Sequence, residues 1–133
     1  MHLSGVILPN ENGEILLIHR STPHRTQWEI PGGKIEPNEE PPVAAAREAL
    51  EELGIVVSIL RELGSESFEE DGHSMMYTWF LGDTNNVEPR IGEPDKYDGI
   101  RYWPIRELGT TSETISPNTA NFLRHLNAGL VRI

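Results

Sequence analysis

The sequence predicts an α/β fold in which a mixed β-sheet is covered on both faces by helices. Apolar segments rich in branched residues, typical of strands, lie on both sides of one central helical segment, and a second helical segment closes the chain. The 133 residues show no compositional break that would mark a linker. We therefore expect one compact domain over residues 1–133.

The first two strands are expected to form a β-hairpin. Residues 3–8 and 14–19 are apolar and rich in branched side chains, and the segment between them contains the Asn-Gly pair typical of a tight turn. Residues 20–27 are interpreted as a loop that leads to a glycine-rich corner at residues 32–33.

The central helix is expected over residues 43–53. Proline suits its first turn, at Pro41 and Pro42, and Gly54 suits its C-terminal cap. Its apolar periodicity predicts that one side is buried, composed of Val43, Ala46, Leu50 and Leu53.

The remaining elements follow from the same patterns. Strands are expected over 55–60, 66–70, 73–81 and 100–105, with a turn at 70–72, a polar loop at 92–99 and a final helix over 116–127.

Charge and cysteine content exclude several classes of function. The formal net charge is -10, and no basic stripe is present that would bind nucleic acid or an anionic membrane. Cysteine is absent, which excludes disulfides, thiolate metal sites and cysteine nucleophiles. No apolar run approaches the length of a signal sequence or a membrane span, so we expect a cytoplasmic protein, monomeric or homodimeric.

Three glutamates form an acidic ridge late in the central helix. Glu48, Glu51 and Glu52 lie at i, i+3 and i+4, where like charges repel and where the helix dipole disfavours anions. A solvated helix face is one interpretation. A divalent cation is the better account, because Mg²⁺ is bound by oxygen ligands from carboxylates and phosphates. Arg47 lies four residues before Glu51 and can orient its carboxylate.

These residues match a known pattern. The stretch from Gly33 to Ile55 resembles the Nudix box, and the matching positions are Gly33, Glu39, Arg47, Glu48, Ala49, Glu51, Glu52, Gly54 and Ile55. Ala49 departs from the pattern, because the family favours a larger aliphatic residue there. The stretches WEIPGGKIE, YWPIREL and SPNTANFLRHL resemble the MutT-like branch, whose members hydrolyse nucleoside triphosphates to monophosphates.

The resemblance implies a fold and an activity. It implies an α/β/α sandwich with a mixed, curved sheet, the catalytic helix on one side and the C-terminal helix on the other. It implies hydrolysis of a nucleoside diphosphate linked to another group, here a nucleoside triphosphate, with Mg²⁺ or Mn²⁺. The expected metal ligands are Glu48, Glu51, Glu52 and the backbone carbonyl of Gly32.

The resemblance leaves two positions for the general base. Glu52 is the first candidate, and the second is an acid in the loop before the last strand, with Asp98, Asp95 and Glu93 available there. Glu39 is expected to tether the segment between the glycines and the helix.

The substrate-binding residues are expected to come from several segments. Arg20, Arg25 and Lys34 can contact phosphates, although exposed basic side chains are often only solvated. Asn118 occupies the position of a purine-contacting asparagine in the MutT-like pattern, and an ordinary place in the first helical turn is the alternative. The aromatic candidates are Trp28, which either flanks the site or covers the corner, and Tyr77.

Tyr77 belongs to an alternating set with His73, Met75 and Trp79. Such a set can form a base-stacking wall, although core packing is its commoner role.

Other functions remain open. ADP-ribose or a dinucleoside polyphosphate is the alternative substrate within the family, and a non-catalytic nucleotide-sensing module is an alternative outside enzymology. The isomerase branch that acts on isopentenyl diphosphate is excluded, because it uses a cysteine. Metal-dependent release of phosphate or pyrophosphate from nucleotides discriminates an enzyme from a sensor.

Overall fold

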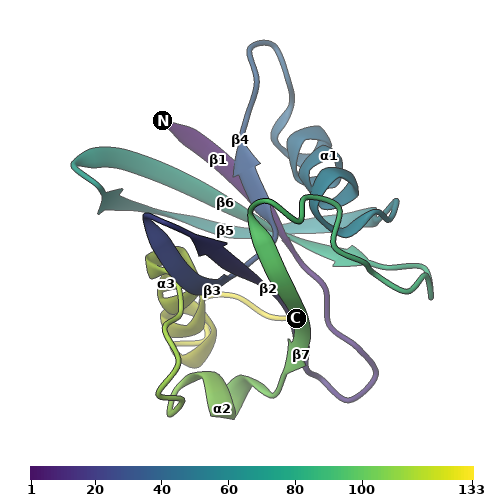
Figure 1. Cartoon of the computed structure of the whole chain (residues 1–133), viewed down its shortest axis with the longest axis vertical. Coiled ribbons are helices and arrows are strands. Elements are labelled where there is room, and N and C mark those ends of the chain that lie inside the picture. The colour runs from purple at the N-terminus through teal and green to yellow at the C-terminus, as the bar shows by residue number, and fades with distance from the viewer.

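The computed structural model describes all 133 residues and shows two β-sheets between helices (Figure 1). The four-stranded sheet has the order β4-β1-β6-β5, and the three-stranded sheet has the order β3-β2-β7. β1 pairs with β6 in parallel, whereas every other strand pair is antiparallel. The elements are β1 (His2–Ile7), β2 (Ile15–Thr22), β3 (Arg25–Glu29), β4 (Gly32–Lys34), α1 (Pro41–Leu53), β5 (Ser58–Glu70), β6 (His73–Asp83), β7 (Tyr97–Trp103), α2 (Ile105–Leu108) and α3 (Pro117–Asn127).

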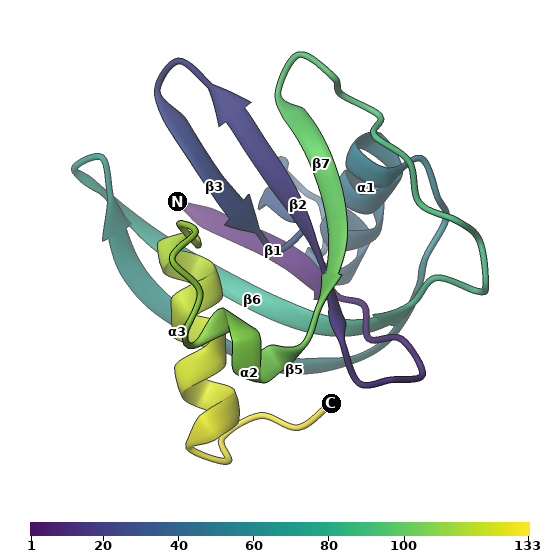
Figure 2. The same cartoon turned by 60° about the horizontal axis from the view of Figure 1, so that its bottom comes forward.

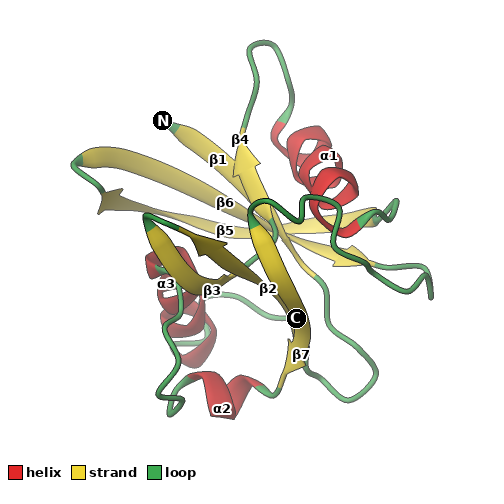
Figure 3. Cartoon of the chain, in the orientation of Figure 1, coloured by secondary structure: helices red, strands yellow, loops and turns green.

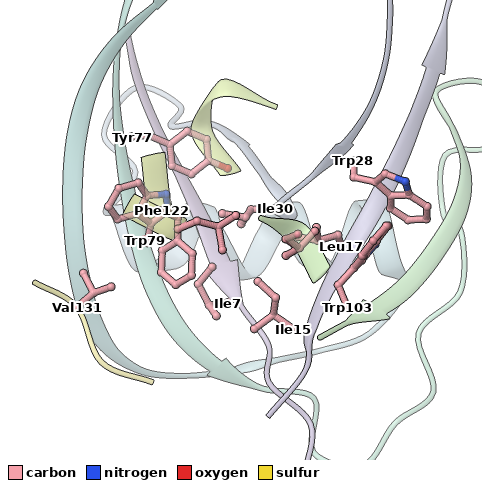
Figure 4. Packing of buried hydrophobic residues seen from close by; sticks show 12 residues of the cluster. Ile7, Ile15, Leu17, Trp28, Ile30, Tyr77, Trp79, Trp103, Phe122 and Val131 are labelled. Carbon is pink, nitrogen blue, oxygen red and sulfur yellow. The ribbon is translucent and has the colours of Figure 1, made fainter. Parts of the chain in front are cut away.

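The helices α1 and α3 lie on opposite sides of the strands (Figure 3). Side chains of β2 alternate between the two sides, as the twofold period of a strand requires. Leu16 and Ile18 pack in the cluster that contains Leu53 of α1, whereas Ile15 and Leu17 pack in the cluster that contains Phe122 of α3 (Figure 4). The predicted α/β class with helices on both faces is confirmed.

The predicted hairpin between residues 3–8 and 14–19 is wrong. The tight turn forms, because Leu16 N donates to Leu8 O at 3.1 Å and Gly13 adopts the left-handed conformation, with φ of 76°. Beyond it the strands separate, so that β1 joins β4 and β6 while β2 joins β3 and β7 (Figure 2). The Asn-Gly signal specifies a reversal of the chain, not the strands that pair beyond it.

The predicted loop over residues 20–27 is also wrong, because most of it belongs to an antiparallel hairpin. β2 and β3 pair from Ile18 and Glu29 to Thr22 and Arg25. This hairpin extends beyond the core, and its polar sequence lacks the apolar alternation that would reveal it. The glycine-rich corner is the short strand β4, which pairs with β1.

The boundaries of α1 agree with the prediction, and its buried side agrees in part, because Leu53 is buried and Ala46 packs against the core as expected, whereas Val43 and Leu50 do not. Pro41 lies in the first turn and Gly54 caps the end with φ of 67°. Val43 and Leu50 are 57% and 49% exposed, whereas Ala49 is fully buried. The small alanines let α1 approach β1 closely, so the larger apolar residues mark the solvent side. The small Ala49 at the Nudix-box position therefore serves packing.

The second half of the chain differs in its strand boundaries. Residues 58–70 form one strand where two were expected, because charged side chains on this edge strand break the apolar pattern. The last strand begins at Tyr97 and ends at Trp103, earlier than predicted. The final helix is confirmed, and Ser116 Oγ accepts a hydrogen bond from Thr119 N at 3.1 Å as its N-cap. None of the helices has the length and apolarity that crossing a membrane requires.

Candidate active site

A cavity of about 410 Å³ collects residues from both sheets, from α1 and from the segment before β7. Most of the residues predicted for the site line it. Those residues are Arg20, Arg25, Gly32, Lys34, Glu48, Glu51, Glu52, Tyr77 and Asn118. The cavity therefore unites most of the residues that the sequence pattern singled out, although they span about a hundred positions of the chain.

Glu52 is the most deeply buried acid of α1, with 2% of its surface exposed. Its Oε1 accepts a hydrogen bond from Gly32 N at 3.0 Å, and its Oε2 accepts one from the Tyr97 hydroxyl at 3.2 Å. Burial raises the pKa of Glu52 well above its ordinary value, and the neighbouring charge of Glu48 raises it further. Without a cation, burial therefore disfavours the ionised form of this carboxyl group.

Glu48 lies against the backbone of Gly33. A β-carbon built on Gly33 would lie 2.6 Å from the carboxyl carbon and from Oε1 of Glu48. Only glycine admits the carboxylate at this place. Burial raises the pKa of Glu48, although a hydrogen bond from Arg47 works in the opposite direction.

Arg47 connects the acidic ridge to the segment before the helix. Its Nε donates to Glu39 Oε2 at 2.7 Å, and its Nη1 lies 3.1 Å from Glu48 Oε1 and 3.2 Å from Glu51 Oε1. Its Nη2 donates to the carbonyl of Lys34 at 3.0 Å. The hydrogen bond from Arg47 lowers the pKa of Glu39. The guanidinium thus holds the helix, the glycine corner and two ridge carboxylates in one arrangement.

The segment before β7 is bound to the C-terminus of α1. Arg90 N donates to Leu53 O and Gly92 N donates to Glu52 O, both at 2.9 Å. These bonds satisfy carbonyl groups that a helix end leaves unpaired. A β-carbon on Gly92 would collide with the carbonyl of Glu51, so glycine permits the close approach.

This attachment places Glu93, and not Asp98, at the cavity. Glu93 lines the cavity beside Lys96, whose Nζ lies 3.3 Å from Glu93 Oε2. Asp98 points elsewhere, because its Oδ1 lies 2.5 Å from His19 Nδ1 and its side chain is 57% exposed. The structure therefore places Asp98 and Asp95 outside the cavity lining, and a role for either acid in the site stays a prediction.

Two of the basic side chains are already engaged by acids. Arg20 pairs with Glu29 through both of its carboxylate oxygens, at 2.8 Å and 3.1 Å. Burial of Arg20 disfavours its charge, but the hydrogen bonds to Glu29 outweigh this effect and raise the pKa. Arg25 contacts Glu70 at 3.2 Å and also Asp71, and so connects the β2–β3 turn to the β5–β6 turn.

The cavity lining also contains apolar side chains and buried polar ones. Tyr77 is buried, and its hydroxyl fills the space beside Gly5 and Gly32 that a β-carbon would otherwise occupy. Asn118 is buried too, and its Oδ1 accepts a hydrogen bond from Trp79 Nε1 at 2.9 Å. The other lining residues here include Leu3, Ile30, Phe68 and Met75.

Trp28 is not part of the cavity. It packs edge-on against Trp103 with 5.4 Å between ring centroids, on the far side of the cluster from Tyr77 (Figure 4), and its Nε1 donates to Glu113 Oε1. Because residues alternate along β3, Trp28 faces the core, and its expected contact with substrate stays a prediction. Of the proposed stacking wall, Met75 and Tyr77 line the cavity, whereas Trp79 is core and His73 is exposed at the start of β6.

Residues 4–126 match the NUDIX domain family. The chain belongs to the Nudix hydrolase family. Human diphosphoinositol polyphosphate phosphohydrolase NUDT4B is 37% identical over 125 residues, and rat diphosphoinositol polyphosphate phosphohydrolase 2 is 38% identical over 125 residues. Each of these alignments covers 90% of this chain and 65% of the relative, so the chain spans less than two thirds of their length.

Solved structures of Nudix proteins share the fold. The MutT protein from Methanosarcina mazei Go1 superposes with a TM-score of 0.84 at 24% identity, covering 97% of this chain and 94% of that chain. The MutT NUDIX hydrolase from Burkholderia pseudomallei superposes with a TM-score of 0.81 at 26% identity, covering 92% and 95%.

The donor set of this Nudix protein fits a hard divalent cation. As they lie, no three acidic or histidine side chains converge on one metal position, because Glu51 is turned towards Arg47. Glu48 and Glu52 nevertheless bring a partly buried and a buried carboxyl group together, and each has a raised pKa that a cation would lower. Gly32 and Gly33 keep the adjacent backbone free of side chains.

Several residues that line the cavity were not predicted from the sequence. Gln27 and Glu29 line the cavity on either side of the inward-facing Trp28, and the alternation of polar residues around an aromatic one is the signal that could have revealed them. Tyr97 was hidden in a segment interpreted as a polar loop. Glu70, Phe68 and Lys96 carry no local signal, because only the tertiary fold brings them to the cavity.

Proposed function

We propose that this chain is a Mg²⁺-dependent hydrolase of nucleoside triphosphates that releases a nucleoside monophosphate and pyrophosphate. The observation that carries the proposal is the combination of two kinds of lining in one cavity. Acidic side chains of α1 and bare glycine backbone line it, and so do apolar side chains and the Asn118 amide. A polyphosphate bound with cations suits the first kind of lining, and a base suits the second.

The residues proposed to hold Mg²⁺ are Glu48, Glu52 and, once released from Arg47, Glu51, together with the carbonyl of Gly32. Mn²⁺ is the expected substitute. When bound, the cation neutralises the phosphates and activates the attacking water. Arg47 orients Glu48 through a hydrogen bond, and Lys34 and Lys96 line the path of the phosphates.

Glu52 is proposed as the proton acceptor for the attacking water. Its burial favours proton uptake, and a cation held beside it would favour its ionised form. Among the loop acids, the geometry favours Glu93 as the alternative, because Glu93 lines the cavity whereas Asp95 and Asp98 do not.

The base is proposed to be recognised by Asn118. Because its Oδ1 is committed to Trp79, the amide offers mainly its NH₂ group to a ligand. An NH₂ group pairs with an acceptor, so a base that carries a carbonyl oxygen at this edge is preferred over one that carries an amino group. The apolar side chains nearby suit the faces of a base.

A diphosphoinositol polyphosphate is the second candidate substrate, favoured by identities of 37–38% to enzymes so named. The charge of the cavity opposes it. Six acidic and four basic side chains line the cavity, and three of the four basic side chains are paired with acids inside it. A ring that carries many phosphates needs a surplus of cations. ADP-ribose and dinucleoside polyphosphates are the remaining alternatives. Both would bind with cations at the same acidic side chains of α1.

The test is a substrate panel with Mg²⁺ or EDTA. It contains the nucleoside triphosphates, oxidised nucleotides, ADP-ribose, diadenosine polyphosphates and a diphosphoinositol polyphosphate, and products are identified by mass spectrometry. In ¹⁸O-water, attack on the α-phosphorus labels the monophosphate, whereas attack on the β-phosphorus labels pyrophosphate. The proposal expects metal-dependent turnover of a triphosphate with α–β cleavage. Glu52→Gln is the inactive control.

Preference for the inositol compound or ADP-ribose would reject the proposed substrate but retain the metal chemistry. Absence of turnover on every compound would favour a nucleotide-sensing module. One domain over residues 1–133, a cytoplasmic location and a monomeric or homodimeric state stay predictions.

A further inference from the structure

We infer that Tyr97 is a positioning residue that fixes the direction of Glu52 and thereby sets the affinity for the divalent cation. This inference rests on the proposed metal site. Tyr97 touches no reacting atom. It acts through a hydrogen bond whose direction is imposed by Arg20.

The direction follows from what each group can do. Arg20 Nη2 lies 2.9 Å from the Tyr97 hydroxyl, and a guanidinium has no acceptor, so the hydroxyl must accept this bond. The hydroxyl has only one proton, which is then available to the second neighbour, Glu52 Oε2, at 3.2 Å. A phenol ordinarily keeps its proton near neutral pH. Tyr97 therefore donates to Glu52 and holds the carboxylate in one orientation.

Arg20 is itself held in place. It is bound by both oxygens of Glu29, and Gln27 Nε2 donates to Glu29 Oε2 at 2.6 Å. Arg20 and Tyr97 are also partners across the β2–β7 pair, beside an irregularity in register at His19 and Arg20. The chain of hydrogen bonds thus begins in β3 and ends at the proposed metal ligand.

The site offers no substitute for the hydroxyl. Tyr97 is 3% exposed and Glu52 is equally enclosed, so solvent cannot readily replace the lost bond. The same Tyr97 starts β7 directly after the segment whose Gly92 N bonds to Glu52 O. The backbone and the hydroxyl of this region therefore both locate Glu52, and removing the hydroxyl leaves only Gly32 N on its carboxylate.

The test compares Tyr97→Phe with the wild type and with Tyr102→Phe, a matched control on the same strand that lies outside the cavity. Mn²⁺ alone is the probe, and its dissociation constant is measured by calorimetry without nucleotide. Loss of a group that orients a ligand typically weakens metal binding by roughly 10–100-fold. We expect that loss for Tyr97→Phe, less than a twofold change for Tyr102→Phe, and activity of Tyr97→Phe that recovers as Mg²⁺ is raised.

A Mn²⁺ dissociation constant for Tyr97→Phe within twofold of the wild type would overturn the inference, and so would a wild-type protein that binds no Mn²⁺. If the wild type binds Mn²⁺ but hydrolyses no nucleotide, the loss in Tyr97→Phe still supports the inference while the proposed substrate fails. Should Tyr97→Phe not fold, Glu29→Gln loosens Arg20 and leaves the hydroxyl in place. A several-fold weaker Mn²⁺ affinity is expected there, and an unchanged one contradicts the inference.

Discussion

Gly33 and Glu48 fit together so closely that a β-carbon on residue 33 would lie 2.6 Å from the Glu48 carboxylate. The two residues belong to different elements, β4 and α1, so the contact fixes how the acidic ridge meets the glycine corner. It explains why a glycine is needed there although the backbone of Gly33 does not have positive φ. The constraint is steric, and it can be tested by adding one methyl group.

Gly33→Ala should displace Glu48 and lower kcat/KM by at least tenfold, which corresponds to about 1.4 kcal/mol of transition-state stabilisation. The matched control is Gly109→Ala, because a β-carbon there would meet only the Arg106 carbonyl at 3.6 Å, an ordinary contact. Activity with Mg²⁺ and the thermal midpoint are measured for both variants. Equal activity of Gly33→Ala and wild type would show that Glu48 does not need its present position.

Replacing Glu52 should change how stability depends on pH. The pKa of Glu52 is raised in the folded protein above its ordinary value of 4.5, so the folded state binds this proton more tightly than the unfolded state. Its contribution to stability is fully present below pH 4.5 and is lost as pH rises through the folded pKa. In EDTA, Glu52→Gln should therefore become increasingly more stable than wild type as the pH rises above 4.5.

The measurement is the free energy of unfolding by urea at several pH values, with EDTA or Mg²⁺. Mg²⁺ should stabilise the wild type at neutral pH and should have less effect on Glu52→Gln. Turnover of Glu52→Gln should fall by orders of magnitude at the same time, because one ligand charge is lost. A variant that is less stable than wild type in EDTA at neutral pH would instead indicate a structural role for this carboxylate.

The sequence predicted the acids of the site better than their surroundings. Helical spacing places Glu48, Glu51 and Glu52 on one stretch of α1, and that relationship needs only the local 3.6-residue period. The orientation of α1 was predicted correctly only in part, because Val43 and Leu50 suggested an apolar buried face. Alanines of α1 are buried instead, and the glutamates of the acidic ridge line the cavity.

Local sequence patterns do not predict which strands pair with each other. β1 and β2 are consecutive and apolar, yet they lie in different sheets. β1 lies between β4 and β6, and β2 lies between β3 and β7. Tyr97 and Glu52 are 45 residues apart, and their contact exists only after the segment before β7 has closed over the end of α1. No period or turn residue in the sequence encodes such a contact.

Glu93 and Asp98, two of the loop acids, can be compared in a kinetic test for the general base. Removal of a general base typically costs 10²–10⁴-fold in rate. With Glu52 in that role, Glu93→Gln should lower kcat by less than about tenfold, and Asp98→Asn should leave it unchanged, because Asp98 contacts His19 outside the cavity. A loss of 10²-fold or more in Glu93→Gln, with a changed pH profile of kcat, would transfer the role to Glu93.

Asn118 provides the sharpest test of base recognition. Asn118→Ala removes the NH₂ group and leaves Trp79 Nε1 without its acceptor, so it should lower kcat/KM for the preferred nucleotide by roughly 1–3 kcal/mol and also destabilise the fold. Asn118→Asp separates these effects, because one carboxylate oxygen still accepts from Trp79 while the other replaces the donor with an acceptor. This variant should lose activity on carbonyl-bearing bases and shift its preference towards bases with an amino group.

Both variants are assayed on four nucleoside triphosphates, with Asn121→Asp on the same helix as the control. A uniform loss on all four nucleotides would show that Asn118 shapes the cavity without reading the base, and an unchanged Asn118→Asp would place base recognition among the other residues that line the cavity.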